Sequence, residues 1–122
     1  MKVVYYSLVG NVRRFLAKTG LPAQPIGDYD MYEPFVIVTN TLGFGVVPEP
    51  VGNFLERNGR NLVGVASSGN RNWGKNFGKA ADIIGKMFDV PVLLKFELSG
   101  TDDDVRIFTE RMREIDETYR TE

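Results

Sequence analysis

Two runs of consecutive apolar residues constrain this chain most strongly, because each is followed by a glycine-rich segment and then by a helical pattern. The runs are Phe35–Thr39 (FVIVT) and Leu62–Ala66 (LVGVA). Strands that are apolar at nearly every position are covered on both faces, which is typical of parallel sheets. The two runs therefore predict neighbouring strands of a parallel sheet whose connections cross over through helices.

Shorter patterns predict the remaining elements. Further strands are expected at residues 3–6, 24–26 and 91–98, while residues 28–34 have no clear assignment. Apolar side chains at helical spacing predict four helices. These side chains are Val12, Phe15 and Leu16; Val51, Phe54 and Leu55; Phe77, Ala80, Ala81, Ile84 and Phe88; and Val105, Phe108, Met112, Ile115 and Tyr119. Pro48 and Pro50 suit the first turn of the second helix, and Thr101 with Asp104 has the spacing of a capping box for the last.

This order of elements predicts an α/β fold in one domain spanning residues 1–122. Five strands that alternate with helices fit a flavodoxin-like doubly wound parallel sheet of order 2-1-3-4-5, with helices on both faces. In such a sheet, ligands bind beyond the carboxyl ends of the strands, where the strand order reverses. The three glycine-rich segments follow the first, third and fourth predicted strands, so we expect them to converge on one site.

Composition narrows the chemistry of that site. The chain contains no cysteine and no histidine, so it lacks a thiol nucleophile, a disulfide and the commonest general base. Redox chemistry would therefore depend on a bound cofactor, and we expect no metal site. A net charge of -1 gives no indication of binding to nucleic acid or to an anionic membrane. No apolar run approaches the ~20 residues of a membrane span, and no signal-peptide pattern is visible, so we expect a cytoplasmic protein.

The first glycine-rich segment, Ser7–Val12, has the layout of a phosphate-binding turn. Backbone N–H groups at the start of a helix are unpaired donors, and the helix dipole favours an anion there. Ser7 and Asn11 add side-chain donors, and Gly10 allows close approach of the backbone. Neither a Gly-Lys-Ser/Thr sequence nor Gly-x-Gly-x-x-Gly is present, which argues against an ATPase and a dinucleotide fold. Taken alone, the segment fits equally well a plain helix start capped by serine.

The other two segments are more distinctive. Thr39–Gly45 has two glycines around Phe44, although an ordinary strand-to-helix turn would look similar. Ser67–Gly74 surrounds the only tryptophan, Trp73, with polar residues and glycines. An aromatic ring in such a loop suits a stacking platform for a ligand, and the alternative is a ring that folds back over the edge of the sheet.

Together these segments resemble the NrdI family, the small flavodoxin-like proteins associated with class Ib ribonucleotide reductase. The resemblance covers nearly the whole chain, and four segments carry it in the right order. They are Gly10–Phe15, Thr41–Pro48, Gly64–Gly74, and Pro91 with Lys95–Thr101. Two departures stand out: Val9 occupies a position that is commonly threonine in flavodoxin-type loops, and Asn40 stands where relatives often have an aromatic residue.

The resemblance implies one non-covalently bound FMN. Its phosphate would lie at Ser7–Val12, and its isoalloxazine ring would lie between the second and third segments against Trp73. The implied contacts are Ser7, Leu8, Val9, Gly10, Asn11, Val12, Thr39, Asn40, Thr41, Leu42, Gly43, Phe44, Ser67, Ser68, Gly69, Asn72, Trp73 and Gly74. Gly43 and Phe44 would adjoin flavin N5, and we expect the peptide at Leu42–Gly43 or Gly43–Phe44 to turn its carbonyl toward N5 on reduction.

The resemblance also implies partners. The reduced flavin would react with molecular oxygen, and the oxidant would activate the dimanganese-tyrosyl radical cofactor in the beta subunit of the reductase. The manganese belongs to that subunit, and the electron donor would be an unknown reductase. Two alternatives stay open: an electron-shuttling flavodoxin with another redox partner, and a receiver-like or phosphate-binding module without flavin. The absence of an acidic residue at the end of the first strand disfavours a receiver domain.

Overall fold

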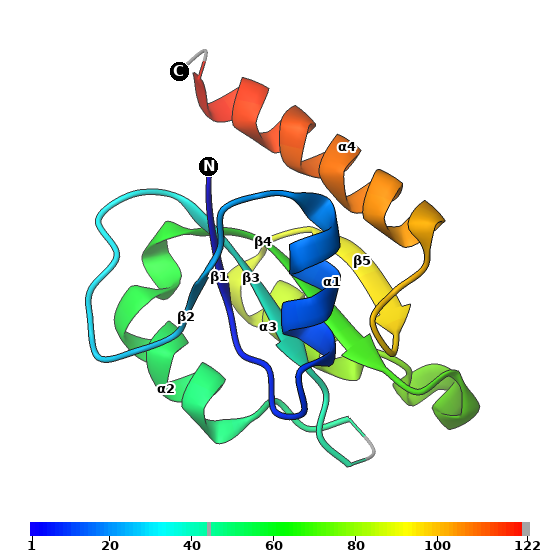
Figure 1. Ribbon diagram of the computed structural model, residues 1–122. Coiled ribbons are helices and arrows are strands. Elements are labelled where there is room, and N and C mark those ends of the chain that lie inside the picture. The colour runs from blue at the N-terminus through cyan, green and yellow to red at the C-terminus, as the bar shows by residue number, and fades with distance from the viewer. Residues whose placement is uncertain (44, 121–122) are drawn as a thin grey trace.

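The computed structural model describes residues 1–43 and 45–120, which form a parallel five-stranded sheet between two layers of helices (Figure 1). The strand order is β2-β1-β3-β4-β5, so the predicted fold class is confirmed. The strands are β1 (Lys2–Tyr5), β2 (Gln24–Pro25), β3 (Phe35–Asn40), β4 (Leu62–Gly69) and β5 (Val92–Glu97). The helices are α1 (Asn11–Thr19), α2 (Glu49–Asn58), α3 (Lys79–Phe88) and α4 (Asp102–Arg120), with the short 3₁₀ segments η1 (Gly59–Asn61) and η2 (Arg71–Asn76).

The central strand β3 explains why the sequence is apolar along its whole length there. Val36 and Val38 join the core under α1 and α4, whereas Phe35 and Ile37 join the core under α2 and α3. All four side chains are fully buried. Successive side chains of a strand point to opposite faces, so a strand covered on both faces needs an apolar residue at each position.

Three phenylalanines tie the α1 and α4 layer to the sheet. The rings of Phe15 in α1 and Phe96 in β5 stack with centroids 4.1 Å apart, and Phe108 in α4 meets Phe15 edge to face at 5.4 Å. All three side chains are completely buried. This cluster fixes the first helix, the last strand and the last helix relative to one another.

Two predicted boundaries are wrong. Strand β4 does not end at Ala66 but continues to Gly69, because Ser67 and Ser68 pair with β3 on one side and β5 on the other. Helix α3 begins at Lys79, so Phe77 precedes it. The capping box of α4 is confirmed: the Thr101 N–H donates to Asp104 Oδ2 at 2.8 Å, and the Asp104 N–H donates to Thr101 Oγ1 at 3.1 Å.

The crossover from β2 to β3 contains no helix, and each of its residues, 26–34, is described. Buried Asn58 at the end of α2 holds this crossover in place. Its Oδ1 accepts the N–H of Met31 at 2.7 Å, and its Nδ2 donates to the carbonyl of Tyr29 at 3.3 Å. Asn61 Nδ2 donates to the Met31 carbonyl at 2.8 Å. The segment that the sequence left unassigned is thus a pinned irregular loop.

We predict that Phe108→Ala lowers the free energy of unfolding by about 3–5 kcal/mol, because it opens a cavity beside Phe15 in a fully buried cluster. Tyr32→Ala is the matched control, because Tyr32 is 88% exposed. It should change the free energy by less than about 0.5 kcal/mol. Chemical denaturation of both variants tests this, and equal stabilities would contradict the packing described.

Candidate functional site

The ends of β1, β3 and β4 lie side by side, and the segments that follow them enclose a cavity. We call these segments the first loop (residues 6–10), the second loop (41–48) and the third loop (70–78). The cavity has a volume of ≈ 320 Å³. Its lining is Leu8, Val9, Asn11, Asn40, Thr41, Leu42, Gly43, Ser68, Gly69, Asn70, Trp73, Glu97 and Leu98. The fold therefore brings the three loops together at one cavity, as the sequence predicts.

The first loop ends in the start of α1. Gly10 caps the helix in a left-handed conformation with φ 90°, and no side chain caps it. Ser7 is not the helix cap; its Oγ accepts the N–H of Arg13 at 3.2 Å. The Arg14 guanidinium donates from Nη2 to Asn11 Oδ1 at 2.7 Å and to the Val9 carbonyl at 3.4 Å. Backbone N–H groups at a helix start and a nearby cation favour an anion, and from this first turn of α1 the residue that lines the cavity is Asn11.

The end of β3, just before the second loop, contributes an unusual polar group. Asn40 Oδ1 is buried at the cavity, and no hydrogen-bond partner for it exists within residues 1–43 and 45–120. Leaving a buried acceptor unpaired costs about 1–3 kcal/mol, so such an atom points to a donor supplied by a ligand. Beyond Asn40 the chain turns tightly, because Leu42 and Val46 exchange backbone hydrogen bonds of 2.9 and 2.8 Å. Gly43 has φ 50° within this turn.

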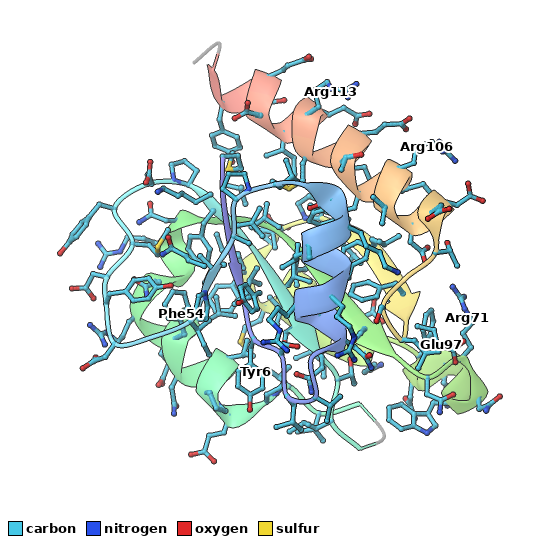
Figure 2. All side chains as sticks on the ribbon, viewed as in Figure 1. Tyr6, Phe54, Arg71, Glu97, Arg106 and Arg113 are labelled. Carbon is cyan, nitrogen blue, oxygen red and sulfur yellow. The ribbon has the colours of Figure 1, made fainter. Side chains whose placement is uncertain are left out.

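The third loop places Trp73 on the wall of the cavity, where the ring is half-buried. Trp73 lies in η2, whose start is capped by Asn70: the Asn70 Oδ1 accepts the N–H of Asn72 at 2.9 Å. Arg71 lies over the ring of Phe77, 4.6 Å from its centroid. Figure 2 shows η2 with Arg71 and Glu97 near each other at the edge of the sheet. The tryptophan is thus presented at the ligand edge, as a stacking platform requires.

The structure gathers most of the predicted contact residues, but not all of them. Among the described residues, those predicted but not lining the cavity are Ser7, Gly10, Val12, Thr39, Ser67, Asn72 and Gly74. Val12, Thr39 and Ser67 are buried in the body of the fold. Phe44 lies outside the described residues. Asn70, Glu97 and Leu98 were not predicted, although the end of β5 adjoins that of β4 and the rule of converging strand ends could have found the last two.

A larger hollow of ≈ 960 Å³ lies on the other side of the first loop, and we call it the outer hollow. Tyr6 in the first loop and Phe54 in α2 line it, and both are labelled in Figure 2; Ser7 and Gly10 also line it. Arg57 closes one side by donating to Asp28 at 2.6 Å and Asp30 at 2.7 Å, and these hydrogen bonds raise the pKa of Arg57. None of the described residues of the second and third loops contributes to its lining.

Comparison with solved structures defines the class of fold. The chain is similar to a Streptococcus pneumonia TIGR4 flavodoxin, with a TM-score of 0.71, 20% identity, and coverage of 89% of this chain and 92% of that one. It is also similar to a short-chain flavodoxin associated with a bacterial microcompartment, with a TM-score of 0.70, 18% identity, and coverage of 89% and 90%. The fold is therefore flavodoxin-like.

Sequence comparison is more specific. The family model described as "NrdI Flavodoxin like" matches residues 3–110. Protein NrdI of Macrococcus caseolyticus (strain JCSC5402) is 48% identical over 124 residues, an alignment that covers 100% of this chain and 96% of that protein. The chain belongs to the NrdI flavodoxin-like family.

Within the described part of the chain, no group of three or more histidine, cysteine, aspartate or glutamate residues is arranged to hold a metal ion. None of its helices combines the length and apolar character that a membrane crossing requires.

We predict that Gly43→Ala lowers the free energy of unfolding by about 1 kcal/mol, because a Cβ is strained at a φ of 50°. No described atom lies within 4 Å of the added Cβ, so the penalty is conformational and not steric. Gly52→Ala in α2 is the matched control, since its Cβ also meets open space but at helical φ, and it should stabilise by about 0.5–1 kcal/mol. Opposite signs in chemical denaturation are expected, and a stabilising Gly43→Ala would contradict the turn.

Proposed function

We propose that this protein binds one FMN non-covalently in the three-loop cavity and activates the dimanganese-tyrosyl radical cofactor of class Ib ribonucleotide reductase. Membership of the NrdI flavodoxin-like family supports the proposal, as does the name of the relative that matches the whole chain. The observation that carries it is the convergence of the first, second and third loops on one cavity with a tryptophan wall and an unpaired buried acceptor.

The residues around the cavity fit FMN in three respects. The start of α1 with Arg14 beside it suits the phosphate. The half-buried ring of Trp73 suits a flat apolar ring system. Asn40 Oδ1 needs a donor, and FMN offers ribityl hydroxyls and a ring N–H. Val9 supplies no hydroxyl at the phosphate loop, and the loss of one neutral hydrogen bond costs only about 1 kcal/mol.

FMN held in this cavity would supply the redox chemistry between molecular oxygen and the radical subunit. The chain contains neither cysteine nor histidine, so the role of its own residues is limited to binding and orienting the cofactor. In this proposal, the peptide at Leu42–Gly43 or Gly43–Phe44 would turn its carbonyl toward flavin N5 on reduction. Electrons come from a reductase that remains to be identified.

The entrance of the cavity suits docking of a protein. Leu8, Val9 and Leu98 line the cavity, and they are 57%, 70% and 68% exposed. We call these three residues the apolar rim. Exposed apolar side chains that adjoin a site mark protein contacts, and here they would exclude water from the path between the flavin and the radical subunit.

Titration of the purified protein with FMN provides the first test. We expect a yellow one-to-one complex with quenched flavin fluorescence. Trp73→Ala should weaken FMN binding roughly fivefold, and Trp73→Phe should retain most of the affinity, because stacking contributes about 1 kcal/mol. A wild-type protein that stays colourless with excess FMN would remove every flavin-based function and favour a module without flavin.

A second test separates the reductase activator from an electron-shuttling flavodoxin. Reduced protein is mixed with Mn(II), oxygen and the radical subunit of a class Ib reductase from the same organism, and the tyrosyl radical is followed by electron paramagnetic resonance. We expect radical formation only when FMN is bound. FMN binding without any radical in the subunit would favour the shuttle.

A further inference from the structure

A fourth segment reaches the cavity, and it comes from the turn between β5 and α4. We call residues 97–100 the β5–α4 turn. It is closed by the Gly100 N–H, which donates to the Glu97 carbonyl at 3.0 Å. Leu98 in this turn has φ 55°, a left-handed conformation that strains a branched non-glycine residue. Residues held in this way cluster at functional sites, where the surroundings enforce them.

The surroundings here are the side of α1. Lys18 Nζ donates to the carbonyls of Ser99 and Gly100 at 3.2 and 3.1 Å. A Cβ on Gly100 would lie 2.6 Å from Cδ1 of buried Phe15, so the turn packs directly on the helix. Two charge-assisted hydrogen bonds and this close approach hold the turn in its strained form.

Arg14 joins the same turn to the first loop. Its Nε donates to Ser99 Oγ at 3.2 Å, while its Nη2 donates to Asn11 Oδ1 at 2.7 Å and to the Val9 carbonyl at 3.4 Å. Ser99 Oγ also lies 3.4 Å from Asn11 Oδ1. One guanidinium therefore fixes the distance between the anion-binding end of the cavity and the β5–α4 turn.

Glu97 joins the turn to the third loop. Its Oε2 accepts the backbone N–H of Arg71 at 3.1 Å, and its Oε1 lies 4.0 Å from the Arg71 Nε (Figure 2). The Arg71 guanidinium is also stacked on Phe77. The ion pair is loose and partly solvent-exposed, and the Glu97 side chain belongs to a residue that lines the cavity.

We propose that the β5–α4 turn is a fourth cofactor-binding loop, in which Leu98 contacts the flavin and the Glu97 carboxylate lowers its reduction potential. The inference rests on the proposed binding of FMN. A negative charge beside the ring opposes the charge gained on reduction, so Glu97 weakens binding of the reduced cofactor more than of the oxidised one. Leu98 lines the cavity, so contact with the cofactor would give its strained conformation a function.

Glu97→Gln tests the electrostatic role. Glutamine keeps an oxygen that accepts the Arg71 N–H but removes the charge. We expect the ratio of reduced-FMN to oxidised-FMN affinity to rise roughly three- to tenfold, with a more positive midpoint potential. Glu110→Gln is the matched control, because Glu110 is also paired with an arginine, Arg106, but lies in α4 and does not line the cavity. It should leave the ratio unchanged.

Leu98→Gly tests the contact. Because glycine relieves the strain, the unliganded variant should have a thermal midpoint at or above that of the wild type, while its affinity for oxidised FMN falls about fivefold. A purely structural role would move stability and affinity in the same direction. An unchanged affinity ratio in Glu97→Gln together with unchanged affinity in Leu98→Gly overturns this inference alone. Failure of the wild type to bind FMN overturns the proposed function as well.

Discussion

Parallel pairing of β3 with both β1 and β4 is the constraint on which the remaining structure depends. It buries β3 on both faces, and it aligns the carboxyl ends of three strands along one edge. The chain must leave each end through a loop before it can return as a helix, so three loops necessarily meet there. The position of the cavity follows from backbone hydrogen bonding, and only the identity of its lining is left to individual side chains.

Because strand pairing sets the position of the cavity and individual side chains set its lining, the two could be predicted from the sequence to different extents. The strands and their order were accessible, because burial on two faces leaves an uninterrupted apolar run such as Phe35–Thr39. The end of β4 was not, because Ser67–Gly69 has the composition of a loop and joins the strand only through pairing on both sides. Likewise the contact between Arg14 and Ser99 joins residues 85 positions apart, and no local pattern encodes it. Trp73 was found because a lone aromatic residue among glycines has few structural uses.

Two hydroxyls expected to meet the cofactor also brace the site from behind. Ser67 Oγ donates to the Gly78 carbonyl at 2.8 Å and accepts the Ala81 N–H at 3.2 Å. Thr41 Oγ1 accepts the Ala80 N–H at 3.3 Å. The second loop and the end of β4 are thus attached to the start of α3, so that helix acts as a rigid support for the cavity.

The crossover from β2 to β3 contains no helix, and it lines the outer hollow together with the first loop. The first loop separates two spaces, the cavity on one side and the outer hollow on the other, and Leu8 and Val9 face both. A segment with free volume behind it opens locally at low cost. The first loop is therefore the wall whose bending into the outer hollow would open the cavity, whereas the second loop and the end of β4 are attached to α3.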